Sequence, residues 1–326
     1  MRSVAVHHES WPLRGVFAIS RGARTHSEVV VVELRDGGAV GRGECVPYPR
    51  YGESVPGVMA AIEQIAGRVV EGLDRPGLES CMPAGAARNA LDCALWDLDA
   101  KRLGCPAHTL AQLPPPAPVV TAFTISLDTP QAMAASAAEA DRYPLLKLKL
   151  GGDGDIARVR AVRQAVPDTR LIVDANEAWS AAQLPDYLGA MTDLGVELVE
   201  QPLHAGEDDA LGGIPHPVPV CADESCHTSA DVPGLVGRYD VVNVKLDKAG
   251  GLTEAIRVVA AARAVGLRVM IGTMMGTSLL MAPAMLLAFA ADWVDLDGPL
   301  WLARDREDAL RWDGRHLHPP SPALWG

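Results

Sequence analysis

Two lysines stand two residues apart in an otherwise apolar run. The run reads YPLLKLKLGGDGD from Tyr143 to Asp155, and its lysines are Lys147 and Lys149. Side chains of a β-strand alternate between two faces, so both ammonium groups point one way and the leucines point the other. Neighbouring segments also have the pattern of buried strands, so we expect both lysines to face an interior. Burial and a nearby positive charge lower the pKa of a lysine toward about 7–8, where it can act as a general base.

Three carboxylates end the next three strand-like runs. They are Asp174, Glu200 and Asp223, and parallel strands would bring them to one rim. Without a cation, three converging carboxylates repel and raise one another's pKa. Carboxylate oxygens are hard ligands that suit Mg²⁺ and leave positions open for water or substrate. We therefore predict one Mg²⁺ held by these three side chains. The alternative for any one of them alone is a helix cap or a solvated loop acid.

A third lysine, Lys245, ends the strand-like run after the carboxylates, whereas Lys149 ends the one before them. The two amines would then stand on opposite sides of whatever the metal holds. One would remove a proton from one face of a carbon, and the other would deliver a proton to the opposite face. We expect Lys147 to lower the pKa of Lys149 and to contact the substrate carboxylate, unless it pairs with a neighbouring acid. Lys248 follows in a KAGG turn, and we expect it to face solvent or a neighbouring acid.

Eight strand-like runs position these residues, and Ala/Leu/Arg-rich stretches of helical character separate them. The steps from Lys149 to Asp174, Glu200, Asp223 and Lys245 are 25, 26, 23 and 22 residues, which is sufficient for repeated βα units. The pattern predicts a (β/α)8-type barrel, whose chemistry lies at the carboxyl ends of the strands. The alternative, an open doubly wound sheet, lacks its GxGxxG turn here. The eight runs are 119–127, 145–150, 171–177, 198–203, 219–225, 241–246, 268–275 and 293–300.

The first part of the chain has a different pattern. Two apolar runs, 29–34 and 39–44, flank the turn sequence RDGG, which predicts a hairpin, and two helical stretches follow near 54–72 and 84–103. We assign 1–112 to a small α+β capping domain, joined by the C-terminal tail 304–326. Residues 113–303, which begin at the linker Pro114–Pro116, form the barrel.

Composition narrows the classes of partner. The chain has 326 residues, is 48% hydrophobic and 21% charged, and carries a formal net charge of -12. That charge disfavours nucleic acid and anionic membrane surfaces, which need a basic footprint. Six cysteines without CxxC spacing, and the lack of an apolar leader, favour a cytoplasmic protein with reduced thiols. The apolar stretch LLMAPAMLLAFA is too short to span a bilayer and is expected to form a buried helix. We expect a small-molecule partner, and a homo-oligomer is compatible with the sequence.

Five motifs in this order resemble the muconate-lactonizing subgroup of the enolase superfamily. They are KLK (147–149), DAN (174–176), VEQPL (199–203), ADES (222–225) and NVKL (243–246), and the resemblance covers nearly the whole chain. It implies that Asp174, Glu200 and Asp223 bind one Mg²⁺, that Lys149 and Lys245 are the acid/base pair, and that Lys147 is the auxiliary lysine. It also implies proton transfer through an enediolate stabilised by Mg²⁺.

The eighth run, WVDLDGPL, distinguishes among the reactions of this subgroup. Asp295 and Asp297 share one face of it and would aim at the pocket, where two carboxylates suit a substrate ammonium group. A DxD here resembles the dipeptide epimerases, which hold the amino terminus of a dipeptide with it. Muconate and N-acyl substrates have no such amine. The alternative is that the pair caps a following helix or lies in solvent.

An N-terminal loop adds a second indication. In FAISRGARTHSEVVVVEL, Arg21 and Arg24 precede the first strand pair, and a guanidinium there could bind a second substrate carboxylate in bidentate fashion. With GECVPYPRYGES (43–54), this loop resembles dipeptide epimerases that act on L-Ala-D/L-Glu. Arg21 aligns better with the arginine that meets the glutamate side chain, and Arg24 is the second choice. A solvated loop arginine is the alternative for either.

The resemblance therefore implies a Mg²⁺-dependent epimerase that inverts the glutamate α-carbon of L-Ala-Glu. Alternatives with the same chemistry are an epimerase for other dipeptides, an N-acylamino-acid racemase and an o-succinylbenzoate synthase. A barrel without turnover belongs to a different class, and the two-lysine set disfavours it.

Overall fold

Residues 3–45 form a three-stranded antiparallel sheet in the computed structural model, which describes residues 2–326. Its strands are β1 (Ser3–Ile19), β2 (Gly22–Asp36) and β3 (Ala39–Cys45), in the order β1-β2-β3. The predicted hairpin at RDGG is confirmed, because β2 and β3 pair across Gly37 and Gly38, which adopt φ of 58° and 89°. Strand β1 was not predicted, since much of it is only half-buried and its sequence does not alternate cleanly.

Helices α1 (Val55–Val70), α2 (Arg75–Cys81) and α3 (Ala86–Leu103) complete the capping domain. The two helices predicted near 54–72 and 84–103 are confirmed as α1 and α3. Both pack on one face of the sheet, around a buried cluster that includes Val32, Ile62 and Leu91. Helix α3 approaches β3 so closely that a Cβ at Gly43 would lie 2.1 Å from the carbonyl oxygen of Ala90. Only glycine permits this contact.

The eight predicted runs form one parallel sheet in the order β11-β10-β9-β8-β7-β6-β5-β4. The sheet curls into a nearly closed barrel, because Ala122, just before β4, donates a backbone hydrogen bond to Val294 of β11 (2.8 Å). The predicted (β/α)8-type fold is confirmed. The strands are β4 (Phe123–Ile125), β5 (Leu145–Lys149), β6 (Arg170–Asp174), β7 (Val196–Glu200), β8 (Val220–Ala222), β9 (Val241–Lys245), β10 (Arg268–Gly272) and β11 (Trp293–Asp295).

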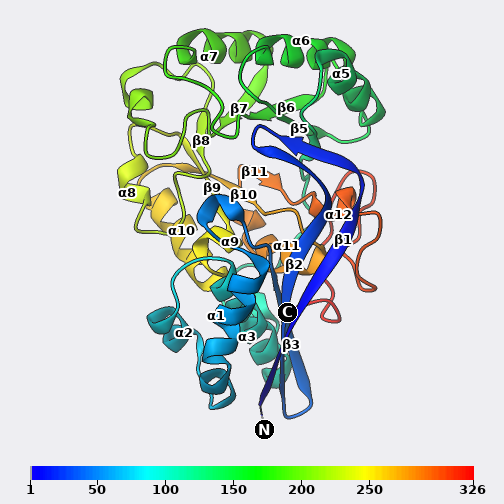
Figure 1. The fold of residues 1–326 in the computed structure, drawn as a ribbon, viewed down its shortest axis with the longest axis vertical. Coiled ribbons are helices and arrows are strands. Elements are labelled where there is room, and N and C mark those ends of the chain that lie inside the picture. The colour runs from blue at the N-terminus through cyan, green and yellow to red at the C-terminus, as the bar shows by residue number, and fades with distance from the viewer. Residues whose placement is uncertain (1) are drawn as a thin grey trace.

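Helices cover the outside of this barrel, as Figure 1 shows. The connection between β7 and β8 differs from the predicted βα pattern. It contains only a 3-10 turn, Asp209–Gly213, in a segment rich in glycine and proline. The first part of the apolar stretch LLMAPAMLLAFA lies in the buried helix α11, as predicted, whereas its end forms a 3-10 turn (Ala288–Ala290) in which Phe289 is exposed. The helices are α4 (Ala107–Leu110), α5 (Pro130–Glu139), α6 (Asp155–Ala165), α7 (Leu184–Asp193), α8 (Val232–Leu235), α9 (Leu246–Ala249), α10 (Leu252–Ala264), α11 (Ser278–Met285) and α12 (Gly298–Trp301). Nowhere in residues 2–326 is there a helix of the length and apolarity that a bilayer crossing requires.

The barrel interior is layered, because every second residue of each strand points inward. One apolar cluster closes the bottom with Ala122, Leu145, Ile172, Leu198, Cys221, Val241, Met270 and Trp293. Two residues further along each strand, the inward positions are Thr124, Lys147, Asp174, Glu200, Asp223, Asn243, Gly272 and Asp295. On seven of the eight strands, the inward position that follows the apolar layer is therefore polar, and Gly272 of β10 is the exception.

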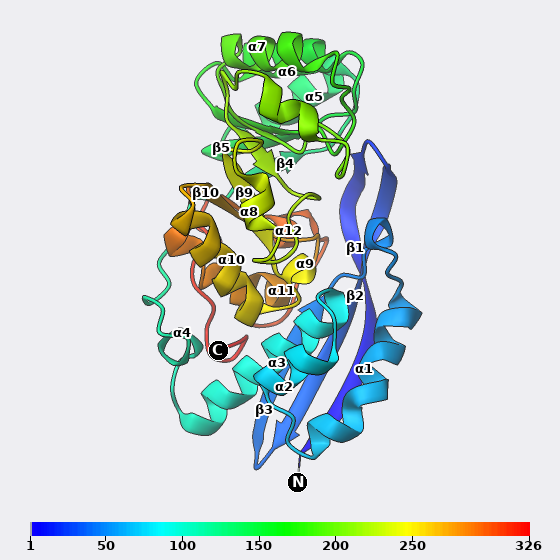
Figure 2. The ribbon, with the colours of Figure 1, turned by 90° about the vertical axis from the view of Figure 1, so that its left-hand side faces the viewer.

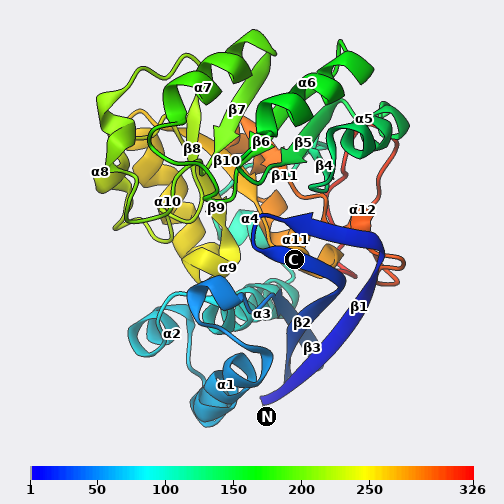
Figure 3. The same ribbon diagram turned by 45° about the horizontal axis from the view of Figure 1, so that its top comes forward.

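The capping domain reaches this polar end of the barrel. Its long β1–β2 hairpin extends beside the barrel in Figures 1 and 2, and in Figure 3 the hairpin lies toward the strand ends. The C-terminal tail binds the capping domain as well. Trp325 donates its indole N–H to the carbonyl oxygen of Cys93 (3.1 Å), and the amide of Gly326 donates to Asp97 (2.7 Å).

Candidate active site

Lys149 and Lys245 stand on opposite walls of the barrel. Both end their strands, and β5 and β9 are separated by three strands on either side in the sheet order. Strand pairing fixes how far along the barrel each lysine lies. Lys149 is in register with Asp174 of β6, and Lys245 is in register with Gly272 of β10. Both side chains are largely buried, at 11% and 8% exposure. A small molecule between them would therefore meet an amine on each side.

Asp174, Glu200 and Asp223 lie on the three strands between those lysines, and the ammonium groups of the lysines reach them. Lys149 Nζ lies 2.5 Å from Asp174 Oδ2, and Lys245 Nζ lies 2.6 Å from Asp223 Oδ2. The chain thus brings its predicted metal ligands and its predicted bases into direct contact.

Lys147 lies deeper in the same cluster and is 1% exposed. Its Nζ is 2.5 Å from Glu200 Oε2, 2.7 Å from Asp295 Oδ2 and 3.4 Å from Asp174 Oδ2. Burial opposes its charge, but the three carboxylates outweigh burial and hold the pKa of Lys147 well above its ordinary value. Lys147 is therefore a cation that contacts both Asp295 and two of the three predicted metal ligands, Asp174 and Glu200.

The carboxylates also respond to the lysines. Burial alone would raise the pKa of Asp174, but Lys149 and Lys147 lower it to about 2. Burial likewise disfavours charge on Lys245, yet Asp223 and Glu200 raise its pKa. As the side chains stand, this favours the protonated form of Lys245, and the residue could act as a base only if another cation took over the carboxylates.

Each of the three acids has one oxygen held from outside the cluster. Asp174 Oδ1 accepts from the amide of Asn176 (2.9 Å), and Glu200 Oε1 accepts from Asn243 Nδ2 (2.7 Å). Asp223 Oδ1 accepts from Lys248 Nζ (2.7 Å). The other oxygen of each acid faces the lysines. This donor set suits a hard divalent cation, although no group of three Asp, Glu, His or Cys side chains within residues 2–326 is arranged to hold one as it stands.

Asp295 and Asp297 lie on the opposite arc of the rim and line the same pocket. Asp295 Oδ2 accepts from Lys147, whereas Asp295 Oδ1 is buried and has no hydrogen-bond partner in the described chain. Asp297 accepts from the amide of Thr124 (2.6 Å), and burial with the nearby Asp295 charge raises the pKa of Asp297 to about 7. Asp297 precedes α12, but its side chain makes no cap hydrogen bond to that helix.

The two loop arginines differ in their partners. Arg21 donates to Glu177 (3.0 Å), to Glu224 (2.7 Å) and to the hydroxyl of Tyr48 (3.0 Å). Burial lowers the pKa of Arg21, but Glu224 and Tyr48 outweigh burial and raise it. Arg24 has neither a hydrogen bond nor an ion pair among the residues described; its guanidinium carbon lies 6.0 Å from the ring centre of Phe17. Burial lowers the pKa of Arg24. Both arginines line the pocket, but only Arg24 has its charge unmatched.

The cavity at this site is small, about 60 Å³. Apolar side chains of the capping domain and of the loop after β10 cover it, among them Phe17, Ile19, Met274 and Met275. The hydroxyl of Ser27 on β2 donates to the carbonyl oxygen of Met275, which fixes that loop to the capping sheet. A dipeptide would require the cover to open.

Lys248 and Asn243 contact the predicted metal ligands, although the sequence assigned neither of them to the site. Lys248 was expected to face solvent or a neighbouring acid, and the second alternative is confirmed, because its side chain is 1% exposed and bound to Asp223. Asn243, which supports Glu200, could have been found from period-two spacing, since it precedes Lys245 by two residues on the same strand.

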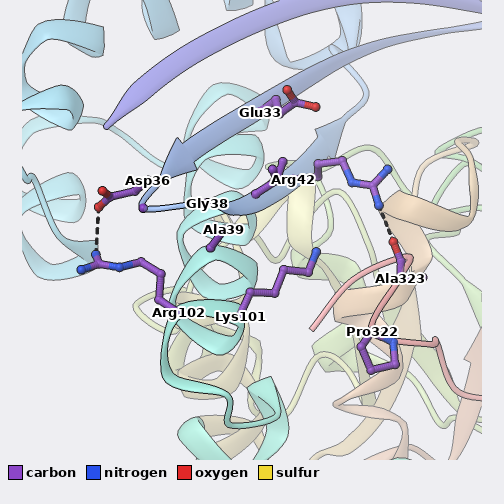
Figure 4. A pocket seen from close by; sticks show the side chains of 11 residues that line it. Glu33, Asp36, Gly38, Ala39, Arg42, Lys101, Arg102, Pro322 and Ala323 are labelled. Carbon is purple, nitrogen blue, oxygen red and sulfur yellow. Dashed lines mark hydrogen bonds and ion pairs between the residues drawn. The ribbon is translucent and has the colours of Figure 1, made fainter. Parts of the chain in front are cut away.

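A larger cavity, of about 810 Å³, lies far from this chemistry, between the β2–β3 turn and the C-terminal tail (Figure 4). Its cations already have partners. Arg102 pairs with Asp36 (3.0 Å), Lys101 pairs with Asp97 (2.8 Å), and Arg42 donates to backbone carbonyls of the tail. We assign it a structural role.

Comparison with known proteins identifies relatives over the full chain. Residues 1–111 match the mandelate racemase / muconate lactonizing enzyme N-terminal domain, and residues 131–322 match the enolase C-terminal domain-like family. An L-Ala-D/L-Glu epimerase of Escherichia coli (strain K12) is 49% identical over 98% of this chain and 100% of its own. An N-acetyl-D-glutamate racemase of Pseudoalteromonas sp. is 44% identical over 91% of this chain and 95% of its own.

Solved structures show the same likeness. An enolase family member from Agrobacterium tumefaciens with homology to dipeptide epimerases, with bound sodium and L-Ala-L-Glu, superposes with a TM-score of 0.98 at 52% identity, covering 100% of both chains. A dipeptide epimerase from Enterococcus faecalis V583, complexed with Mg and L-Leu-L-Tyr, superposes with a TM-score of 0.91 at 30% identity, covering 99% of this chain and 98% of that one.

Proposed function

The chain belongs to the enolase superfamily as an isomerase of amino-acid derivatives, and from that membership we propose that it is a Mg²⁺-dependent dipeptide epimerase acting on L-Ala-D/L-Glu. The reaction inverts the α-carbon of glutamate. One observation carries this proposal: two groups that line the same pocket lack a partner within residues 2–326 of the free protein. They are the oxygen Oδ1 of Asp295 and the guanidinium of Arg24. The first suits an amino terminus, and the second suits the side-chain carboxylate of glutamate.

The three acids would hold Mg²⁺, and the bound ion would attract the substrate carboxylate to their side of the pocket. Asp174, Glu200 and Asp223 supply the hard oxygen ligands, and structures of related epimerases contain Mg. When bound, Mg²⁺ would stabilise the negative charge that grows on the substrate carboxylate as the α-proton leaves. It would also replace the positive charge that Lys149 and Lys245 now give to the acids, which frees both amines to face the substrate.

Lys149 and Lys245 then divide the proton transfer between them. One removes the α-proton from its face of the carbon, and the other delivers a proton to the opposite face. Their positions on opposite walls match this requirement, because inversion needs an acid and a base on different sides. Lys147 remains charged beside Glu200 and Asp295, and it could donate to the substrate carboxylate once Mg²⁺ takes over one of the acids that it now contacts.

The structural difference between the two arginines reverses their order of preference. Arg21 has two carboxylate partners of its own, so we propose that it closes the loop over the site. Arg24 is desolvated in the free protein. Its side chain makes no hydrogen bond or ion pair with the described residues that would have to be broken when a substrate binds. We therefore propose Arg24 as the residue that binds the glutamate side chain.

A second candidate substrate follows from the Pseudoalteromonas relative, a racemase of N-acetyl-D-glutamate. This compound keeps both carboxylates of glutamate but has no amine. It would use the acids and Arg24 in the same way and leave Asp295 Oδ1 without a charged partner. We therefore place it second.

Incubation with L-Ala-D-Glu and Mg²⁺ in D₂O tests the proposal. The other diastereomer should appear, with one deuterium at the glutamate α-carbon, and N-acetyl-D-glutamate should react more slowly. The variants Lys149→Ala and Lys245→Ala should each abolish inversion, but each should retain exchange from the diastereomer whose proton faces the remaining lysine. No deuterium at that carbon in the wild type, or the same exchange pattern in both variants, would reject the proposal.

A further inference from the structure

Lys248 is a buried lysine that donates only to backbone and carboxylate oxygens of the site wall. Its Nζ donates to Asp223 Oδ1 (2.7 Å), to the carbonyl oxygen of Asp223 and to the carbonyl oxygen of Asn243 (3.0 Å). An ammonium group has three hydrogens, and here each has an acceptor. No hydrogen of Lys248 is left for a substrate, so its contacts are with the wall of the site and not with a bound molecule.

Asp223 lies between two lysines that bind different oxygens. Lys245 contacts Oδ2 at 2.6 Å from the pocket side, and Lys248 contacts Oδ1 from behind. The parallel pairing of β8 and β9 ends at Ala222, so Asp223 lies beyond the last backbone ladder contact. Lys248 spans that gap, because it binds the carbonyl of Asp223 after β8 and the carbonyl of Asn243 on β9.

The capping domain fixes the short helix α9 that carries Lys248. Arg88 of α3 donates to the carbonyl oxygens of Ala249 (2.6 Å) and Gly250 (3.1 Å), and Asn89 donates to Asp247 Oδ1 (2.8 Å). These contacts flank Lys248 on both sides. Its ammonium group is therefore a fixed point against which Asp223 is held.

We propose that Lys248 is a positioning residue that holds one oxygen of Asp223 so that only the other faces the divalent cation and Lys245. Asn176 and Asn243 serve the other two acids in the same way, but with neutral donors. This inference rests on the proposed function, since it requires a cation at the three carboxylates. It adds the capping domain to the parts of the protein that determine metal affinity.

The proposal and simple electrostatics predict opposite changes in Mg²⁺ affinity when Lys248 is replaced. Lys248 is a cation close to a cation site, so removing its charge alone would strengthen Mg²⁺ binding. Removing a donor that orients a metal ligand weakens binding, typically by about 10- to 100-fold. We therefore expect Lys248→Met to weaken Mg²⁺ binding at least tenfold, although it makes the site more negative.

Isothermal titration calorimetry of the metal-free protein with MgCl₂ is the test, with thermal unfolding in EDTA to confirm that each variant is folded. Lys248→Gln keeps a donor without the charge and should bind Mg²⁺ with an affinity between those of the wild type and Lys248→Met. It also decides the matter if the Met variant does not fold. Lys101→Met is the matched control, because Lys101 also pairs with a buried aspartate, Asp97, and it lies on α3 beside the β2–β3 turn, away from the strand ends of the barrel. Its Mg²⁺ affinity should equal that of the wild type.

Weaker Mg²⁺ binding by the folded Lys248 variants, with an unchanged Lys101→Met control, supports the inference. Equal or tighter binding by a folded Lys248 variant overturns this inference alone. A wild-type protein that binds no Mg²⁺ overturns the proposed function, and the inference with it.

Discussion

Replacing Arg24 by methionine should remove the preference for a glutamate side chain and leave the chemistry in place. Arg24 has no partner of its own, so the whole gain from pairing with a substrate carboxylate is available for binding. Hydrogen bonds to charged groups contribute about 1.5–3 kcal/mol, and we take about 2–3 kcal/mol for this half-buried pair. At about 1.4 kcal/mol per factor of ten, kcat/KM for L-Ala-D-Glu should fall by about 30- to 150-fold.

The assay compares two substrates that differ only in charge. L-Ala-D-Gln has the shape of L-Ala-D-Glu without the side-chain carboxylate, so its kcat/KM should change little in Arg24→Met. Arg21→Met is the matched control, because Arg21 already has Glu177 and Glu224 as partners. Its loss should loosen the loop and reduce turnover of both dipeptides by similar factors.

Equal losses for both dipeptides in Arg24→Met would refute the assignment. So would a selective loss for L-Ala-D-Glu in Arg21→Met, which would restore the arginine preferred on sequence grounds. In either case the unmatched charge of Arg24 would have no role in substrate choice.

Three other perturbations have defined outcomes. Arg306→Met should lower the free energy of unfolding by about 3–5 kcal/mol in urea titrations, because it leaves the fully buried carboxylate of Glu44 without its ion pair; adding Glu44→Gln should recover part of the loss. His216 donates to Asp240, and this hydrogen bond raises the pKa of His216. The protonated pair therefore stabilises the fold fully below about pH 6.5, the pKa of an unfolded histidine. This stabilisation disappears as the pH rises through the folded-state pKa. The difference in Tm between wild type and His216→Asn should therefore shrink from pH 6 to pH 8, and growth with pH would contradict it. Removal of Mg²⁺ with EDTA should abolish epimerisation, and Mg²⁺ at about 100 times its Kd should stabilise the protein by about 2.7 kcal/mol in calorimetric scans.

The barrel strands were predictable because a parallel strand is buried on both faces and reads as a short apolar run. A polar residue at the end of such a run is conspicuous against that background, which is why Lys149, Asp174 and Glu200 could be placed on one rim. Strand β1 has the opposite character. It is largely half-buried or exposed and contains polar residues on both faces, so neither alternation nor apolarity marks it. No α-helix forms between β7 and β8, because glycine and proline in that segment disfavour one. The even spacing of the strand-like runs suggested a helix there nevertheless.

The partners of each charge could not be predicted, because they come from distant parts of the chain. Arg21 meets Glu177 and Glu224, which follow different strands, and spacing along the sequence does not indicate which loop arginine they will take. Lys248 follows its strand by three residues and would reach solvent if the chain continued outward. Instead the chain reverses at Gly250, where φ is 79°, and α9 turns the lysine back toward Asp223.

Under the proposed function, the distribution of charge around the rim would decide which stereocentre of a dipeptide can be inverted. Asp174, Glu200 and Asp223 occupy the arc between the two lysines, and Asp295 lies on the opposite arc. We therefore expect a bound dipeptide to direct its carboxylate to the first arc and its amino terminus to the second. The carbon next to the carboxylate belongs to the second residue, and it is the one placed between the amines. The reversed dipeptide L-Glu-L-Ala, if it reacts, should consequently take deuterium from D₂O at the alanine α-carbon. Deuterium at its glutamate α-carbon would mean that charge does not set the orientation.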